Sequence, residues 1–310
     1  MCHLASVSRA GYYRKLTEKA PDEAELEVRA AIQEIVLAHR RRYGILRVTK
    51  TLHRRGMIVN HKRVERIMRE DNLLAIRYRK YILTTDSRHD CKVYVNLAAR
   101  LTLTGINQLW IADITYIRLR TEFVYLAVVI DRFSRKVIGW SLDRTLAARI
   151  TVAALRQAIV QRQAPPGVVI HSDQGVQYAC HEYNQVLQAN QMVPSMSRPA
   201  NPYDNAACES FMKTLKQEEI YCNQYKDFEE LSAHLEEFLE NYYNRLRLHS
   251  ALGYRTPEEF EQASAATAAS NTPDAATMNY FTPPKEKSVS GSTDPLSPSS
   301  GSEQVPVISP

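Results

Sequence analysis

Three consecutive stretches of β-type alternation, within residues 108–143, restrict the fold of this 310-residue chain more than any other feature. The first stretch, QLWIADITYIRL, alternates so that two sets of side chains take opposite faces: Ile111, Asp113 and Thr115 on one, and Trp110, Ala112 and Ile114 on the other. The stretches EFVYLAVVIDRF and SRKVIGWSL follow after short turns. Strands joined this closely pair as neighbours, so the sequence predicts an antiparallel meander.

Helical and strand patterns alternate after the meander. Periodicity and turn residues predict, in chain order, a helix Ala147–Gln161, the strand VVIHSD, a helix Tyr178–Asn190, a strand Met192–Met196, and helices Asn205–Glu219 and Phe228–Asn244. The last helix carries an apolar stripe that we expect in the core: Leu231, Leu235, Phe238 and Leu239. Together these elements predict an α/β fold with a mixed five-stranded sheet flanked by helices.

The segment before residue 100 predicts a small helical domain with a helix-turn-helix. Two short helical patterns, Arg47–Arg55 and His61–Arg69, flank GMIVN, and their apolar positions form a core: Val48, Leu52, Val64, Ile67 and Met68. Between Arg40 and Lys80 there are fourteen lysines and arginines against three acids. This basic block indicates DNA binding through phosphate contacts by Arg54, Arg55, Lys62, Arg63 and Arg66. A basic surface on an ordinary helical domain is the alternative.

Composition and pattern divide the chain into four parts. We expect an N-terminal helical segment over 1–35, with Asp22 as its cap, a helix-turn-helix domain over 36–95, and the α/β core over 100–262. Residues 263–310 are rich in Ser, Pro and Ala and hold few large apolar side chains. Such a segment cannot bury enough apolar surface to offset its ordering entropy, so we expect it to be disordered.

Net charge and cysteine usage narrow the cellular setting. A net charge of +6 makes an anionic partner such as nucleic acid plausible. The five cysteines are odd in number, scattered and free of Cys-x-x-Cys pairs, which excludes a disulfide framework and a zinc knuckle. No run of about 18 apolar residues and no signal-peptide pattern is present. We expect a protein of the reducing cytoplasm.

Three acids stand at positions that suit metal binding. Asp113 lies inside a strand, Asp173 directly follows one, and Glu209 lies one turn inside the helix after the loop NPYDN. Taken singly, each has a structural alternative: an acid satisfied by backbone or arginine, a turn or cap residue, and an exposed Glu–Lys pair with Lys213. Taken together, they are the arrangement that clusters oxygen ligands around hard divalent cations, for which we expect magnesium or manganese.

A pair of such ions supports phosphoryl transfer. Two ions about 3.5–4 Å apart activate a water or a 3′-hydroxyl and stabilise the leaving oxygen in an in-line attack on phosphate. Carboxylates suit this chemistry because they hold the metals and offset their charge. The three acids therefore predict a two-metal enzyme that acts on phosphodiesters.

Four motifs in order give the sequence a specific resemblance. They are WIADITYI, HSDQGVQY, NPYDNAACESFMKTLKQE and YNRLRLHSALGYRTPEEF, with 35 residues between Asp173 and Glu209 and Lys216 seven positions after Glu209. In this order and spacing the chain resembles the integrase-core transposases of insertion-sequence family 3, the second-frame (OrfB-type) protein. The resemblance runs from about residue 5 to residue 260 and includes SVSRAGYYRK and the helix-turn-helix segment.

The resemblance implies a fold, an activity and partners. It implies a retroviral-integrase-like ribonuclease H fold and a DDE polynucleotidyl transferase whose metal-binding triad is Asp113, Asp173 and Glu209. Lys216, with Lys213 beside it, would contact DNA near the cleaved phosphate. The activity implied is cleavage at the ends of an insertion element and joining of the freed 3′-hydroxyl to other double-stranded DNA, that is, transposition.

Location and assembly follow from the same resemblance, which implies a bacterial cytoplasmic protein associated with the nucleoid. It implies a homo-oligomer on paired element ends and an upstream-frame partner or fusion, a segment that does not precede Met1 here. The tail over 263–310 is longer than this family leads us to expect. Two rival functions stay open: a non-catalytic DNA-binding regulator or fragment, and a nuclease of the same fold that hydrolyses without joining ends.

Other polar residues carry structural expectations. We expect His171 to pack or hydrogen-bond at its strand end, with approach to the metals as the alternative. Asp131 is the best rival acid for the metal site, but its place before a turn with Arg132 and Arg135 favours a structural ion pair. The residues Tyr243, Arg247 and His249 match the family's terminal motif. We expect them to pack the last helix onto the core, with contact of Arg247 to the DNA backbone as the second reading.

Overall fold

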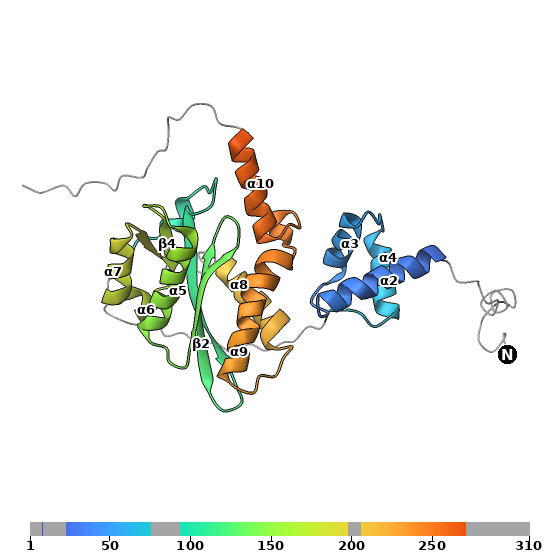
Figure 1. Ribbon diagram of the computed structural model, residues 1–310, viewed down its shortest axis with the longest axis horizontal. Helices are drawn as coiled ribbons and strands as arrows, with labels where there is room; N and C mark the ends of the chain where they lie inside the picture. Colours follow the sequence, from blue (N-terminus) through green and yellow to red (C-terminus); the bar gives the residue numbers. More distant parts are fainter. Residues whose placement is uncertain (1–7, 9–22, 76–93, 198–205, 271–310) are drawn as a thin grey trace, which may run out of the picture. The chain divides into compact units, whose positions relative to one another are not determined.

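The structure, a computed structural model, describes residue 8 and the ranges 23–75, 94–197 and 206–270. Several predictions lie outside these residues: the cap at Asp22, the loop of residues 201–205 before the Glu209 helix, and the disordered tail from residue 271 onward. Figure 1 shows the described elements, whose labels are used below.

Three helices form the N-terminal domain: α2 (Glu23–Ala38), α3 (Ile45–Arg54) and α4 (His61–Glu70). The helix α4 begins where the side chain of Asn60 accepts a 2.9 Å hydrogen bond from the Lys62 amide, a standard N-terminal cap. All five residues predicted for the small core are fully buried: Val48, Leu52, Val64, Ile67 and Met68. The prediction of two helices around a GMIVN turn is confirmed, and α2 packs against both.

A five-stranded mixed sheet forms the second domain, which is the predicted fold class. Its strands are β1 (Leu109–Arg118), β2 (Phe123–Asp131), β3 (Val137–Asp143), β4 (Val169–Ser172) and β5 (Val193–Met196). Their order is β3-β2-β1-β4-β5. The first three strands pair antiparallel, as the short turns between them predict, whereas β4 and β5 pair parallel to β1 and to each other.

Helices separate and cover the strands. The short 3-10 turn η1 (Ala98–Arg100) precedes the sheet, and the later elements are α5 (Ala148–Arg162), α6 (Val176–Ala179), α7 (His181–Ala189), α8 (Ala206–Leu215), the π-helical η3 (Lys216–Ile220), α9 (Phe228–Glu236), the π-helical η4 (Glu237–Leu246), η5 (Ser250–Leu252) and α10 (Pro257–Ser270).

One predicted helix and one predicted boundary need correction. A single helix over Tyr178–Asn190 is wrong, because the chain is extended at Cys180, whose thiol accepts a hydrogen bond from the Tyr183 amide and caps α7. Order was expected to end at Gln262, but α10 continues to Ser270. The sequence of α10 is rich in alanine, which has a high intrinsic helix propensity. The lack of large apolar residues, on which the expected disorder rested, does not reveal such a helix.

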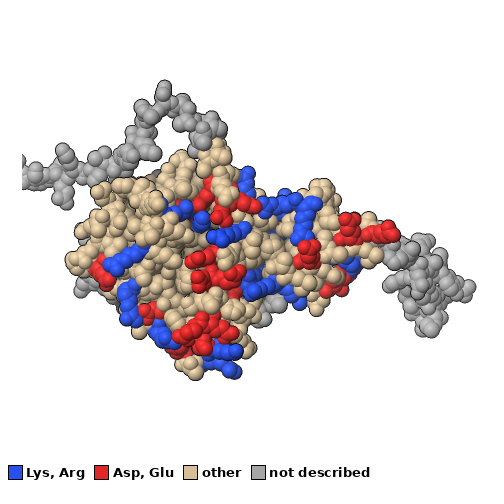
Figure 2. Space-filling model, in the orientation of Figure 1, with Lys and Arg blue, Asp and Glu red and all other residues tan. Residues whose placement is uncertain are grey.

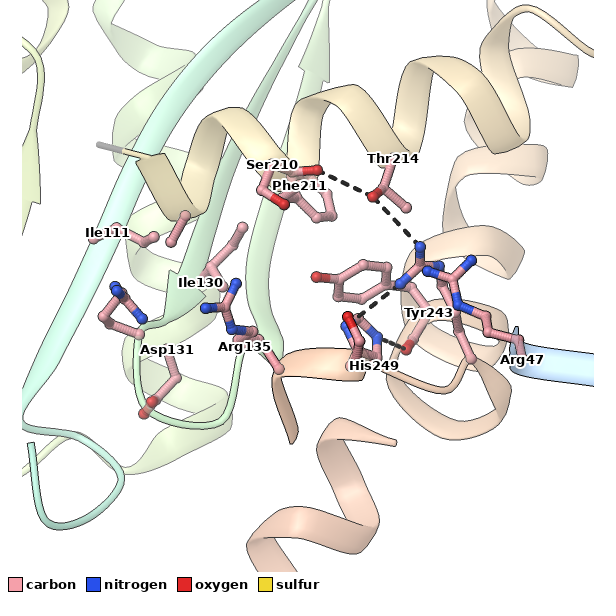
Figure 3. Close-up of a pocket in the computed structure, with 15 residues that line it drawn as sticks. Arg47, Ile111, Ile130, Asp131, Arg135, Ser210, Phe211, Thr214, Tyr243 and His249 are labelled. Carbon is pink, nitrogen blue, oxygen red and sulfur yellow. Dashed lines mark hydrogen bonds between the residues drawn. The ribbon is translucent and has the colours of Figure 1, made fainter. Parts of the chain in front are cut away.

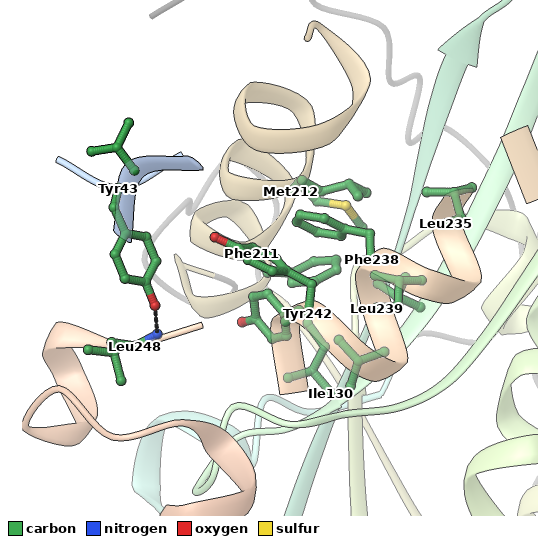
Figure 4. Close-up of a cluster of buried hydrophobic side chains, with 14 of the residues drawn as sticks. Tyr43, Ile130, Phe211, Met212, Leu235, Phe238, Leu239, Tyr242 and Leu248 are labelled. Atoms are coloured by element: carbon green, nitrogen blue, oxygen red, sulfur yellow. Dashed lines mark hydrogen bonds between the residues drawn. The ribbon is translucent and has the colours of Figure 1, made fainter. Parts of the chain in front are cut away.

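The alternation of β1 and β2 separates two apolar cores on the two faces of the sheet. On one face, Ile111 and Ile130 join side chains of α8, α9 and η4, including Phe211 and the predicted stripe on α9 and η4, all of it buried (Figure 4). On the other face, Trp110 and Val129 join α5 and α7. Figure 1 shows α5 to α7 on one side of the strands and α8 and α9 on the other. The sheet is therefore covered on both faces.

Gly139 and Asn244 fit β3 into this arrangement. A Cβ on Gly139 would lie 2.2 Å from the Ala154 carbonyl oxygen of α5, so only glycine allows this close approach. The register of β2 and β3 shifts between Val129 and Ile130. Next to this irregularity the buried Asn244 side chain hydrogen-bonds both the amide and the carbonyl of Val137, each at 2.9 Å. It satisfies backbone groups that would otherwise be buried without partners.

Acidic and basic side chains are interleaved on the face shown in Figure 2. Within the described residues, no helix is both long and apolar enough to cross a membrane.

Candidate active site

Two of the three predicted acids come from neighbouring parallel strands, because Asp113 lies within β1 and Asp173 directly follows β4. The pairing of β1 with β4 sets Leu109 opposite Val169 and Ile111 opposite His171. Continued by two residues, this register brings Asp173 level with Asp113 on the same face, and neighbouring strands lie about 4.8 Å apart. Asp113 accepts a 2.9 Å hydrogen bond from the Ile114 amide, and Asp173 accepts one of 3.0 Å from the Gly175 amide.

Glu209 comes from the first turn of α8, the helix that packs against β1. Phe211, Met212 and Leu215 point from α8 into the core, as the helical periodicity predicts, and Glu209 and Lys213 are exposed. Cys208, directly before Glu209, is fully buried. The buried side chains hold α8 against the sheet. They therefore fix the backbone position from which the Glu209 side chain extends.

Electrostatics tie the three acids together. Burial raises the pKa of the Asp113 carboxyl to about 7, and the charge of Asp173 and then that of Glu209 act in the same direction, against a hydrogen bond from Ile114. The pKa of the Cys208 thiol is also raised, by burial and then by the charges of Asp113, Asp173 and Glu209. Negative charge therefore accumulates where the middle of β1, the end of β4 and the start of α8 meet.

Lys216 supplies positive charge next to these acids. Burial lowers the pKa of its ammonium, while the charge of Asp113 acts to raise it. Its Nζ atom lies 5.2 Å from the centre of the Tyr116 ring, a cation–π distance. One partly buried lysine does not balance three carboxylates.

The donor set fits a divalent cation in composition. No group of three acids, histidines or cysteines in the described part of the chain is already arranged around a metal position. The hydroxyl of Tyr178 is buried without a hydrogen-bond partner among the described residues, and the charges of Asp173 and Asp113 help to raise its pKa. The carboxylates of Asp113, Asp173 and Glu209 are oxygen donors of the kind that Mg²⁺ and Mn²⁺ prefer.

Buried ion pairs anchor the far end of the helix that carries Glu209. Arg247, which is 4% exposed, holds Glu218 through two hydrogen bonds of 2.7 and 2.8 Å. Arg42 donates to the Glu218 carbonyl at 2.8 Å and forms an ion pair with Glu219, which is 1% exposed. Arg47 lies 3.2 Å from Glu218. Two of these arginines belong to the helix-turn-helix segment, so that segment contacts the end of the α8–η3 helix.

The sequence did not reveal this anchor. Its acids lie in a charged helix, and Arg42 is 177 positions away from Glu219, so local spacing gives no sign of the pairing. The one signal was the basic block itself, which we interpreted only as a DNA-binding surface.

Three structural expectations can be compared with the structure. His171 is fully buried, and its ring nitrogens lie 2.9 and 3.0 Å from the hydroxyls of Ser195 and Ser197, so the packing interpretation is confirmed. The expected pairing of Asp131 with Arg132 and Arg135 is wrong. Its carboxylate accepts the amides of Asn107, Phe133 and Ser134, and its cationic neighbour is Arg162 of α5, at 3.8 Å. An acid at the end of a strand is well placed to cap the following turn.

Tyr243, Arg247 and His249 are all buried, as the packing expectation requires. Burial lowers the pKa of the His249 ring to about 2, with the charge of Arg247 acting in the same direction, so this histidine is neutral. The second reading of Arg247 finds no support, because two of its guanidinium nitrogens are committed to Glu218.

The basic side chains predicted to bind DNA in the first domain are mostly paired with acids. Arg54 pairs with Glu259, Arg55 with Glu34, and both Arg63 and Arg66 with Glu25. These pairs are exposed or half-exposed, and such surface pairs are worth little, so DNA phosphates can compete for the arginines. Lys62 is exposed and forms no ion pair with any described residue.

The two domains match known protein families. An HTH-like domain model matches residues 22–81, and two integrase core domain models match residues 104–202 and 190–257. The fold and the family models thus define a class of protein in which a helix-turn-helix domain is followed by an integrase core.

Two curated relatives narrow this class. The transposase for insertion sequence element IS904 of Lactococcus lactis is 36% identical over 241 residues, which are 74% of this chain and 92% of the relative. Transposase InsF for insertion sequence IS3A of Escherichia coli K12 is 35% identical over 271 residues, which are 86% of this chain and 94% of the relative. The chain belongs to the integrase-core transposases of insertion-sequence family 3.

Among solved structures, the chain is similar to the catalytic core domain of HTLV-2 integrase in complex with magnesium. The sequence identity is 19% and the TM-score 0.40, and the match covers 51% of this chain and 97% of that one.

Proposed function

We propose that this chain is a DNA transposase that cleaves at the ends of an insertion element and joins the freed 3′-hydroxyl to other double-stranded DNA. The family membership and the HTH-like domain support action on DNA. The observation that carries the catalytic part is the electrostatic coupling of Asp113, within β1, to Asp173, after β4, and to Glu209, on α8.

Asp113, Asp173 and Glu209 are the proposed metal ligands. When bound, two magnesium or manganese ions would activate the attacking hydroxyl or water and stabilise the leaving oxygen. The raised pKa of Asp113 fits this role, because an uncompensated cluster of carboxylates gains most from a cation. The two strands hold Asp113 and Asp173 in place, and the packed helix holds Glu209.

Lys216 and Lys213 are proposed to face DNA beside these acids. Lys216 lies close enough to Asp113 for their charges to interact, and Lys213 is exposed one turn before it on the same helix. The basic residues of the first domain, Lys62 above all, would add phosphate contacts that do not depend on sequence. Because the proposed enzyme acts on both ends of an element, we further propose a homo-oligomer, with an upstream-frame protein as partner or fusion.

A strand-transfer assay tests the proposal. Purified full chain is incubated with a labelled, pre-nicked element-end duplex and a target plasmid in Mg²⁺, Mn²⁺ or EDTA. The end sequence is taken from the repeats that flank the gene. The variants are Asp113→Asn and Glu209→Gln, with Glu182→Gln as the control for loss of an exposed acid elsewhere.

Each outcome separates one function from its rivals. Joined product that needs a metal, disappears in Asp113→Asn and Glu209→Gln, and persists in Glu182→Gln supports the transposase. Metal-dependent hydrolysis without joining would instead identify a nuclease. Binding without any reaction, in the presence of the upstream-frame protein, would identify a DNA-binding regulator.

A further inference from the structure

A polar cavity of about 100 Å³ lies against the same face of the sheet as α8, outside the carboxylate cluster. Its base includes Ile111 and Ile130, and α8 contributes Ser210 and Thr214 to one wall (Figure 3). Arg132 and Arg135, from the turn between β2 and β3, line another part. A water molecule needs about 10–15 Å³ of such space, so the cavity is large enough for a group of several oxygens.

The cavity holds more positive than negative charge. Four arginines line it, and two of them, Arg47 and Arg247, are ion-paired with Glu218. Arg132 and Arg135 form no ion pair with any residue of the described ranges. Burial is the main cause that lowers the pKa of Arg132, and the charge of Arg135 lowers it further, so the two guanidinium groups lie close enough to repel each other.

The other titratable groups of the cavity do not neutralise these arginines. Asp131 also lines it, but its carboxylate accepts three backbone amides and faces Arg162; in Figure 3 it points away from Ser210 and Thr214. His249 is neutral because its pKa is lowered to about 2 by burial and by Arg247. The arginine pair therefore lacks a counter-ion within the described chain.

A tight turn between β2 and β3 holds the backbone of Arg135. Arg135 adopts a left-handed conformation, with φ of 60°. This region favours glycine or asparagine and costs other residues roughly 1–2 kcal/mol. Its amide hydrogen-bonds the Asp131 carbonyl at 2.8 Å, which closes the turn. The turn therefore fixes where the Arg135 side chain leaves the backbone.

The location points to one kind of anion. Ile111 lies two residues before Asp113 on the same face of β1, which is roughly 7 Å along the strand, and Ser210 directly follows Glu209 on α8. That distance is about two base steps, since successive phosphates of one DNA strand advance about 3.4 Å along the helix axis. A DNA strand at the proposed catalytic carboxylates would carry a neighbouring phosphate to this cavity.

We propose that Arg132 and Arg135 form a binding site for one backbone phosphate of the DNA substrate, beside the carboxylate cluster. Guanidinium groups suit the site because they bind phosphate oxygens through two parallel N–H bonds. The hydroxyls of Ser210 and Thr214 are further polar groups of the wall. The inference rests on the proposed function for the identity of the ligand, but the site itself is defined by its own residues.

Binding measurements on the full chain test the site without requiring catalysis. Affinity for an element-end duplex is measured by fluorescence anisotropy in EDTA over a series of salt concentrations, for wild type, Arg132→Gln and Arg135→Gln. Arg156→Gln is the control, an exposed arginine of α5 on the opposite face of the sheet. Thermal unfolding of each variant checks that it is folded.

The expected result is a loss of about tenfold in affinity for each cavity variant, as for a hydrogen bond to a charged group. The slope of log affinity against log salt should also fall by roughly 0.9, the value for one phosphate contact. Arg156→Gln should change neither. Equal effects of all three variants, or an unchanged slope in folded cavity variants, would overturn the proposal.

Chemically modified element-end DNA, tested against the same variants, locates the phosphate that the cavity binds. Single methylphosphonate substitutions, which remove one phosphate charge at a time, are placed through the element end. At one position near the cleavage site, the substitution should weaken binding to wild type and to Arg156→Gln, but not to Arg135→Gln. If no position behaves in this way, DNA is not the ligand.

A competition arm separates DNA from free phosphate. Inorganic phosphate is added against sodium chloride of equal ionic strength. If it binds the cavity while the cavity variants retain full affinity for DNA, the site takes a free oxyanion and the proposal fails. Failure of strand transfer with these binding effects intact would overturn the proposed function and leave the phosphate site standing.

Discussion

Arg247 and Glu218 form a buried, bidentate ion pair. It joins the segment after η4 to η3, which continues the helix that carries Glu209. Glu218 also serves Arg47, from the helix-turn-helix domain. We predict that Glu218→Gln lowers the free energy of unfolding by about 3–5 kcal/mol, because it leaves Arg247 buried without a counter-charge. Urea unfolding at pH 7 measures this.

The matched control is Glu65→Gln. Glu65 pairs with Arg69 on the exposed surface of α4, with 34% and 67% of the two side chains exposed. Its removal should change the free energy of unfolding by no more than about 0.5 kcal/mol. Similar losses in the two variants would mean that the buried pair adds nothing beyond an ordinary surface pair.

Gly139 is predicted to be irreplaceable where β3 meets α5. In Gly139→Ala, the new methyl group would lie 2.2 Å from the Ala154 carbonyl oxygen and 2.8 Å from the Ala158 amide nitrogen, both rigid backbone atoms. Strand and helix must separate, and overpacking of this kind costs about 1–3 kcal/mol or more. Gly44→Ala, where no atom lies within 4 Å, is the control, and thermal unfolding compares the two. Equal stability of both variants would contradict the close approach.

Buried histidines should make the protein less stable in mild acid. The pKa of His39 is lowered to about 4, first by burial and then by the charge of Arg42, against about 6.5 for an unfolded histidine. Between these values the unfolded chain binds a proton that the folded chain does not, so the free energy of unfolding falls as pH drops from 6.5 towards 4.

The variant His39→Phe tests this dependence. Phenylalanine keeps the stacking on Tyr43, whose ring centre is 3.7 Å away, but cannot be protonated. Urea unfolding between pH 4.5 and 6 should show a slope smaller than that of wild type by up to about 1.4 kcal/mol per pH unit. Parallel pH curves for the two proteins would show that His39 titrates normally in the folded state.

Sequence patterns predicted those features that depend on local periodicity. Ile111 and Trp110 take opposite faces because strand side chains alternate, and Leu52 and Ile67 are buried because helical spacing aligns them. The acids of the candidate site were found from their positions relative to predicted strands and from family spacing. The periodic signals are contained within a few residues of the chain, whereas the spacing of the acids is recognisable only through the family resemblance.

Features that depend on distant partners were missed. Asp131 was assigned to the arginines beside it in sequence, but the turn directs its carboxylate to nearby amides, and its cationic neighbour Arg162 arrives from α5. The break at Cys180 escaped notice because a thiol is an uncommon helix cap. The unpaired arginines of the cavity could not be foreseen, since only the fold shows which acids are out of reach.

The central claim is that Asp113, Asp173 and Glu209 form one metal site. The most direct measurement is a Mn²⁺ titration of the purified chain, in which electron paramagnetic resonance measures the concentration of free Mn²⁺. Wild type and Glu182→Gln should bind Mn²⁺ with the same affinity and stoichiometry, whereas Asp113→Asn and Asp173→Asn should lose most of this binding. Binding that is unchanged in folded Asp113→Asn and Asp173→Asn proteins would contradict the account.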